Sequence, residues 1–175
     1  MARRSEIRGR RVVLRHPHFD DEEAFLAFVR RNRRYHRPWV HPPADADAFA
    51  AFVGTADTER AQKFLVIVRA TGEIAGVANL TEIIRGPLQG AFLGFYGSVD
   101  RAGAGLMTEA IEAVVRHAFR DLGLHRVEAN VRPDNLRSRA LVERCGFRME
   151  GFSPAYLKLG GRWRDHERWA ILADR

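Results

Sequence analysis

The stretch SVDRAGAGLMTEAIEAVVRHAF, residues 98–119, runs from a polar turn through two closely spaced glycines into an apolar, helix-forming segment. The first turn of a helix has backbone N–H groups without intrahelical acceptors and carries the positive end of the helix dipole. Gly103 and Gly105 leave this backbone open to a ligand. The pattern therefore predicts an anion site, with phosphate as the first candidate. An ordinary turn that uses the glycines only for positive φ angles is the alternative.

Around this loop the sequence predicts a succession of strands and helices. Apolar residues at alternating or helical spacing, with proline, glycine and asparagine at the ends, give the bounds. Strands are expected at residues 11–15, 64–68, 74–80, 91–96, 125–131, 156–159 and 163–172, and helices at 20–35, 45–59, 106–123 and 135–143. This order predicts an α/β protein with a mixed sheet, and 175 residues fit one compact domain.

The cysteine content and the hydropathy pattern exclude several classes of protein. Cys145 is the only cysteine, which excludes an intrachain disulfide framework and fits a reducing compartment. No run approaches the ~20 apolar residues of a membrane span, and no apolar segment follows the basic start of the chain. We therefore expect a cytoplasmic protein without a membrane partner.

Motifs for several common activities are missing. No GxxxxGK phosphate loop occurs, and Thr108 stands where a dinucleotide-binding fingerprint needs its third glycine. The chain has no HExxH, CxxC or GxSxG motif, and His125 and His166 lack metal-ligand spacing. The sequence therefore predicts neither a metal site nor a serine hydrolase.

The charge of the chain favours an anionic partner. The formal net charge is +7, and all but two of the 29 basic residues are arginine, the exceptions being Lys63 and Lys158. A basic field of this kind concentrates a polyanionic cofactor, an acidic protein surface or a nucleic acid. Charge alone does not choose among these partners.

The order of strand, glycine loop, helix, strand and an N-x-x-S helix that ends in Gly-Phe resembles the GCN5-related N-acetyltransferases. The Q/R-x-x-G-x-G/A motif of that family falls on residues 102–107, where Ala102 and Met107 depart from it. Further segments are similar to the Rim-type branch, the ribosomal-protein-alanine N-acetyltransferases, from about Val13 to Leu172. These segments are RPW (37–39), IIRG (83–86), LGF (93–95), GLMTEA (105–110), LHRVEANVRPDNLRS (124–138), GFRMEG (146–151) and YLKLGGRWRDH (156–166).

The resemblance implies a single N-acetyltransferase domain over residues 1–175, with a core at about 11–172. Its mixed, mostly antiparallel sheet would have flanking helices and two central strands, near 92–96 and 126–131, that splay apart at a bulge in the first. Acetyl-CoA would be the co-substrate, with no metal. Its pyrophosphate would lie on the backbone of Arg101, Ala102, Gly103, Ala104, Gly105, Leu106 and Met107. Its pantetheine arm would lie along Phe95, Tyr96 and Gly97 and against Asn135 and Ser138.

For the chemistry, the resemblance implies direct attack of a neutral amine on the thioester, with a backbone N–H near Tyr96 or Gly97 stabilising the oxygen. The tyrosine that protonates the leaving thiolate in many relatives is replaced by Val142. In the Rim-type branch the serine of N-x-x-S takes this role, so the resemblance implies Ser138 as the acid. In the alternative, Ser138 only bonds a helix carbonyl.

The base and the acceptor pocket are less defined by sequence. Glu128 and Glu82 are the candidate bases, or else each pairs with an arginine. An α-amine with a pKa near 7.8 costs only about 1 kcal/mol to deprotonate at pH 7, so a weak base or a water suffices. A late glutamate of related enzymes falls at Leu157. The resemblance suggests an acceptor pocket, and the residues predicted to bind the acceptor are Trp39, Arg85, Tyr156 and Trp163. The aromatic ones are alternatively core or lid residues.

The favoured acceptor is a protein N-terminal α-amine, as in the ribosomal-protein enzymes. A small amine is the first alternative. A ribosome- or RNA-associated module that kept the fold without turnover is the second. Both a monomer and a homodimer stay open.

Overall fold

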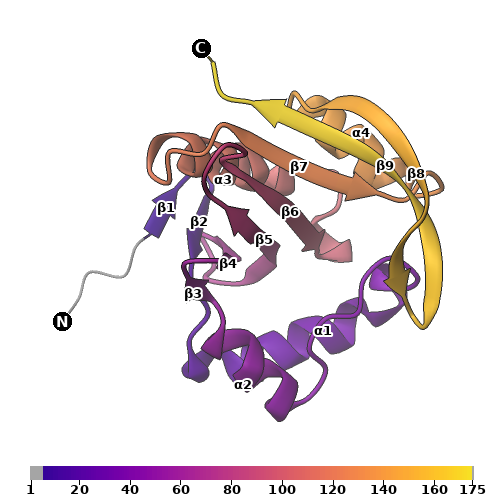
Figure 1. Ribbon diagram of the computed structural model, residues 1–175. Coiled ribbons are helices and arrows are strands. Elements are labelled where there is room, and N and C mark those ends of the chain that lie inside the picture. Colours follow the sequence, from indigo (N-terminus) through magenta and orange to yellow (C-terminus); the bar gives the residue numbers. More distant parts are fainter. Residues whose placement is uncertain (1–5, 175) are drawn as a thin grey trace.

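A computed structural model describes residues 6–174 of the chain (Figure 1). The helices are α1 (Glu22–His36), α2 (Ala46–Gly54), α3 (Leu106–Arg120) and α4 (Leu136–Arg144), with 3-10 turns η1 (Phe19–Asp21) and η2 (Val99–Arg101). The strands are β1 (Glu6–Arg8), β2 (Val12–Arg15), β3 (Asp57–Thr58), β4 (Ala61–Val68), β5 (Ile74–Ile84), β6 (Gly90–Gly97), β7 (Arg126–Val131), β8 (Arg148–Leu159) and β9 (Arg162–Leu172).

The strands form one sheet in the order β1-β2-β4-β5-β6-β7-β9-β8, and β3 pairs with β4. All pairs are antiparallel except β6 with β7, which is parallel. The predicted mixed, mostly antiparallel sheet with flanking helices is therefore confirmed.

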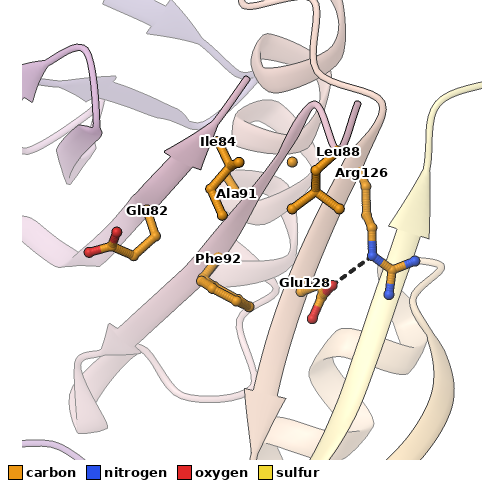
Figure 2. Close-up of a pocket in the computed structure, with 8 residues that line it drawn as sticks. Glu82, Ile84, Leu88, Ala91, Phe92, Arg126 and Glu128 are labelled. Carbon is orange, nitrogen blue, oxygen red and sulfur yellow. Dashed lines mark hydrogen bonds and ion pairs between the residues drawn. The ribbon is translucent and has the colours of Figure 1, made fainter. Parts of the chain in front are cut away.

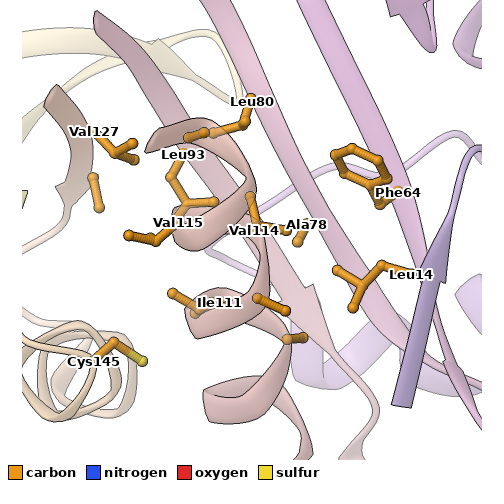
Figure 3. Packing of buried hydrophobic residues seen from close by; sticks show 14 of the residues in the cluster. Leu14, Phe64, Ala78, Leu80, Leu93, Ile111, Val114, Val115, Val127 and Cys145 are labelled. Atoms are coloured by element: carbon orange, nitrogen blue, oxygen red, sulfur yellow. The ribbon is translucent and has the colours of Figure 1, made fainter. Parts of the chain in front are cut away.

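Helices cover both faces of this sheet. Helix α3 packs on one face, where Leu80, Leu93 and Val127 of the sheet meet Ile111 and Val114 of the helix (Figure 3). Helices α1 and α2 pack on the other face through an aromatic cluster. That cluster consists of Phe25, Phe28, Phe49 and Phe52 against Leu65 and Val77. Each face thus has its own core, and the strands between them are buried on both sides.

The two central strands separate after a short stretch of pairing. Strand β6 pairs with β7 only from Gly90 to Phe92, opposite Arg126 to Glu128. The rest of β6 keeps its register with β5, but no strand within residues 6–174 pairs with its other side. The predicted splay is confirmed, and we call the space between the diverging strands the gap.

The bulge, however, lies on a different strand from the one expected. Thr81 pairs with Phe92 and Ile84 with Gly90, so the extra residue is on β5, and β6 runs unbroken from residue 92 to 97. Glu82 takes a φ of 46° at this bulge. A bulge increases the local twist of its strand, so the added twist lies in β5. Strand β6 keeps a regular alternation of backbone groups along the gap.

Some predicted bounds were also wrong. The helix expected over 45–59 ends at Gly54, because Lys63 N–H donates to Ala56 O at 2.7 Å and the chain turns to pair β3 with β4. The strand expected over 156–159 begins at Arg148, and β1 was not expected at all. Strand β8 lies at the sheet edge with most of its residues exposed, so it lacks the apolar alternation that reveals a strand.

Two glycines fix the position of α3 on the sheet. A Cβ on Gly76 of β5 would lie 2.5 Å from Met107 Sδ and 2.6 Å from Tyr96 O, and a Cβ on Gly97 of β6 would lie 3.0 Å from Met107 Cγ. The Met107 side chain therefore fills the space that both glycines leave. This contact sets the distance between the start of α3 and the strands.

We expect Gly76→Ala to lower the free energy of unfolding by about 1–3 kcal/mol, because the methyl group meets a backbone oxygen that cannot move aside. Gly54→Ala is the matched control, since its Cβ meets no atom of residues 6–174 within 4 Å. Urea unfolding of both variants measures the difference. Equal stability of Gly76→Ala and the parent would contradict this packing.

Candidate active site

The glycine loop forms a backbone cradle at the start of α3. Gly103 and Gly105 have φ angles of 78° and 76°, and Gly105 is the N-cap of α3 without a side-chain cap. The N–H groups of Arg101, Ala102 and Ala104 donate to carbonyls inside the loop at 3.2–3.3 Å. The other backbone N–H groups predicted to bind the pyrophosphate are those of Gly103, Gly105, Leu106 and Met107. Within residues 6–174, none of them donates to a backbone carbonyl.

A charged clamp holds this cradle against β2. Glu109 in the first turn of α3 accepts from the backbone N–H groups of Arg11 and Val12 at 2.6 and 3.2 Å. Partial burial would raise the pKa of the Glu109 carboxyl, but these hydrogen bonds and the Arg11 guanidinium outweigh it and lower the pKa. Arg11 also donates to Ala104 O at 2.9 Å. Arg11 therefore adds positive charge to the cradle, a contribution that the sequence did not reveal.

Strand β6 presents backbone groups to the gap. Ser98 N–H donates to Ala75 O of β5 at 2.8 Å, and neighbouring residues of a strand point their backbone groups to opposite sides. The groups of Phe95 and Gly97 therefore face the gap, whereas those of Tyr96 face β5. His36, at the end of α1, donates from Nε2 to Gly97 O at 2.9 Å. Of the two predicted N–H donors to a thioester oxygen, Gly97 has the suitable direction.

Asn135 and Ser138 lie together at the start of α4. Asn135 is the N-cap, and its Oδ1 accepts from Ser138 N–H at 3.2 Å. Within residues 6–174, no helix carbonyl accepts from the Ser138 hydroxyl. The hydroxyl is thus not committed to the helix, and its role as an acid stays a prediction.

Both candidate bases have arginine partners. Glu128 accepts from Arg126 Nε at 2.7 Å, and Glu82 accepts from Arg60. Figure 2 shows Glu82 and Glu128 on either side of Phe92. Both line a hollow of about 10 Å³ over the paired ends of β6 and β7. The ion pairs support the structural interpretation of both carboxylates, and a catalytic role for either stays a prediction.

The four predicted acceptor-binding residues do not gather in one place. The Arg132 guanidinium carbon lies over the Trp39 ring, 4.9 Å from the centre of that ring, and the Tyr156 ring meets the His166 ring edge-on. Trp163 is 62% exposed near the β8–β9 turn. Arg85 donates to Leu122 O past the end of α3. Arg85 is therefore placed at the paired end of β6 and β7, away from the splayed end where Trp39 lies.

Sequence reasoning missed several polar residues of the α1 face of the gap. His36, Asn79 and Asn130 each have a buried side-chain atom without a hydrogen-bond partner in the described part of the chain. The signal for Asn79 was a polar residue among the apolar residues at the start of β5. Asn130 follows Arg126 and Glu128 at alternate positions of β7, so it did not stand out. For His36 no local pattern distinguishes it from its basic neighbours.

Residues 11–148 match the family described as the acetyltransferase (GNAT) domain. The chain belongs to the GNAT acetyltransferases. Over 176 aligned residues it is 34% identical to the probable N-acetyltransferase YjcK of Bacillus subtilis, covering 95% of this chain and 96% of that protein. The ribosomal protein uS5-alanine N-acetyltransferase of Escherichia coli is 33% identical, with 89% and 84% covered.

Among solved structures, Mycobacterium smegmatis RimJ in complex with CoA-disulfide has a TM-score of 0.85 and 30% identity, covering 93% of this chain and 82% of RimJ. This acetyltransferase is thus a GNAT enzyme that uses acetyl-CoA as co-substrate. The geometry fits that substrate, because the cradle has free N–H donors and positive φ angles at both glycines. Neither a bilayer-spanning helix nor a metal-holding His, Cys, Asp or Glu group occurs within residues 6–174.

We expect Gly105→Glu to abolish the thermal protection that CoA gives the acetyltransferase, because the side chain places a negative charge in the cradle. Gly72→Glu is the matched control. Gly72 has a φ of 75°, so the backbone strain is the same, and it lies in the β4–β5 turn. Melting curves with and without CoA compare the two variants. Full protection of a folded Gly105→Glu variant would place the phosphates elsewhere.

We also expect Cys145 to be inert in the native protein. Burial, followed by the nearby Glu112 charge, raises the pKa of the Cys145 thiol to about 12. At pH 8 only roughly one thiol in ten thousand would then be ionised. A disulfide reagent should therefore detect one thiol per chain after unfolding and almost none before. Rapid stoichiometric labelling of the native protein would contradict this environment.

Proposed function

We propose that this acetyltransferase modifies the N-terminal α-amine of a protein, in the manner of the ribosomal-protein enzymes that it resembles. The observation that carries the proposal is the likeness of most of the chain to an enzyme of that kind. The ribosomal protein uS5-alanine N-acetyltransferase of Escherichia coli is 33% identical over 89% of this chain.

The charge on the α1 face does not choose between a protein terminus and a polyamine, so the test includes both. Arg126, Arg132 and Arg168 lie on this face, because their positions alternate with the α3-facing residues of β7 or pair across to such a position. Arg126 is engaged by Glu128 and Glu150, and Arg132 by Asp134, so these charges are balanced.

The chemistry requires little of the protein beyond positioning. The Gly97 N–H faces the gap and would stabilise the thioester oxygen as the amine attacks. A weakly basic group suffices for an α-amine, since its pKa lies close to neutral. Glu128, held by Arg126 opposite Phe92, would accept the proton only through a chain of waters, because Phe92 is five residues and so roughly 16 Å along β6 from Gly97.

The acceptor is tested with a peptide that begins with alanine, the same peptide with a blocked N-terminus and an added lysine, and spermidine. Free thiol release from acetyl-CoA gives the rate, and mass spectrometry locates the acetyl group. We expect turnover only with the free α-amine. Efficient acetylation of spermidine without any peptide turnover would refute the proposal, and thiol release with none of them would favour a non-catalytic role.

Ser138 is our proposed acid for the leaving thiolate. Ser138→Ala should lower kcat about 10²-fold with little change in KM for acetyl-CoA, the usual scale for a positioned general acid. Ser138→Thr keeps a hydroxyl and should recover a substantial part of the rate. Steady-state kinetics on folded protein decide the role. If kcat of Ser138→Ala stays within threefold of the parent, Ser138 is not the acid.

A further inference from the structure

The end of α1 and the residues that follow it make contact with both of the strands that diverge. On the β6 side, His36 Nε2 donates to Gly97 O at 2.9 Å. On the β7 side, Arg132, the residue after the strand, donates from Nη1 to Pro38 O at 3.4 Å. The Arg132 guanidinium carbon also lies 4.9 Å from the centre of the Trp39 ring. One short segment therefore connects the separated ends of the two strands.

The two contacts lie at nearly the same distance from the point where the strands part. Phe92 and Glu128 are the last residues paired between β6 and β7. Gly97 stands five residues beyond Phe92, and Arg132 stands four residues beyond Glu128. Parallel strands advance about 3.3 Å per residue, so both contacts lie roughly 13–16 Å from the last pair. The segment thus spans the open end of the gap.

On the β6 side the segment is attached at two points, one helical turn apart. Asn32 and His36 are both buried, with exposed fractions of 1% and 3%. Asn32 Oδ1 accepts from Val99 N–H at 2.7 Å, just beyond the residue that His36 binds. The backbone oxygen of His36 also accepts from Trp39 N–H at 2.7 Å. The segment is therefore fixed to the end of β6 and closed into a turn on itself.

On the β7 side the guanidinium of Arg132 is held in one orientation. Its Nε and Nη2 donate to the two carboxylate oxygens of Asp134 at 3.0 and 2.5 Å, which lowers the pKa of Asp134. The guanidinium is planar, so this paired contact also fixes the direction of Nη1 toward Pro38 O. The Arg132 side chain is only 12% exposed. It is a fixed connection rather than a mobile surface charge.

A gap that admits one extended arm has a definite width. Neighbouring strands lie 4.7–4.9 Å apart, so an arm that pairs with β6 like an added strand needs β7 about 10 Å away. A wider gap would let the thioester move relative to the Gly97 N–H, and a narrower one would exclude the arm. Displacing reacting groups by about 1 Å can lower a rate about 100-fold. The separation of the strand ends therefore matters for the reaction.

We infer that residues 32–39 form a strut that sets the width of the gap at its open end. Asn32 and His36 attach the strut to β6, and Arg132 attaches it to β7. All three are positioning residues for acetyl-CoA, because they contact the strands and not the reacting atoms. The inference takes the pantetheine arm to lie in the gap. It is independent of the acceptor and so does not rest on the proposed protein substrate.

The strut is tested by calorimetry with CoA and with adenosine 3′,5′-bisphosphate, which has no pantetheine arm. His36→Leu and Arg132→Gln should each weaken CoA about three- to tenfold, the effect of one lost hydrogen bond. The affinity for the bisphosphate should stay unchanged. His36→Gln keeps an N–H donor and should recover most of the affinity for CoA. Arg34→Gln, at an exposed position of the same helix, is the control for the loss of one positive charge.

A double-mutant cycle separates one strut from two unrelated contacts. His36→Leu and Arg132→Gln should each lower kcat about ten- to a hundredfold in folded protein. Either substitution disconnects the same strut, so the double variant should be little worse than the worse single one. Independent contacts would instead multiply their effects. The variants are assayed with whichever amine the parent acetylates, so a small-amine preference would refute the proposed function without affecting this test.

Three outcomes would overturn the strut. In the first, both single variants bind CoA and turn over like the parent. In the second, the affinity for the bisphosphate falls as much as that for CoA, which would indicate damage to the cradle or the fold. In the third, the effects on kcat multiply in the double variant. Arg132 lies outside both apolar cores, so Arg132→Gln decides the binding comparison even if His36→Leu does not fold.

Discussion

The organisation of this enzyme depends on a strand with one unpaired side in the middle of its sheet. After Phe92, the outward groups of β6 pair with no strand in the described part of the chain, since β7 has moved away. Backbone groups at the centre of a sheet are normally all paired. Here their partners must come from elsewhere. His36 satisfies Gly97 O, and a substrate that lies in the gap can satisfy others.

The anion cradle is useful only if it keeps a fixed distance from this gap. Two contacts of different kinds provide that. Met107 fills the space above Gly76 and Gly97, and Glu109 bonds the backbone of β2. The Met107 contact depends on the volume of a side chain, and the Glu109 contact depends on hydrogen bonds to a charged carboxylate. Both residues lie in the first turn of α3. The same short segment thus supplies the free N–H groups and the means of holding them in place.

Local patterns predicted most of the elements, the glycine loop and, through family resemblance, the splay. The predictions failed where structure depends on contacts between distant residues. Residues 57–58 are a strand because they pair with β4, and the bulge at Glu82 is visible only once β5 and β6 are in register. The ion pair of Glu82 with Arg60 and the distant position of Arg85 are likewise set by the tertiary fold, and no spacing rule encodes them. The pair of Glu128 with Arg126 is different, because residues two apart in a strand share a face.

The outermost strand, β8, has a consequence for the behaviour of the protein in concentrated solution. A long edge strand offers its free N–H and C=O groups to other chains and so favours aggregation. In β8 the register shifts between Ser153 and Leu157, Ala155 has a φ of 46°, and Pro154 contributes no N–H group. Asp165 of β9 occupies the N–H of Ala155 at 2.8 Å. The irregular edge interrupts the template on which a second molecule would have to align.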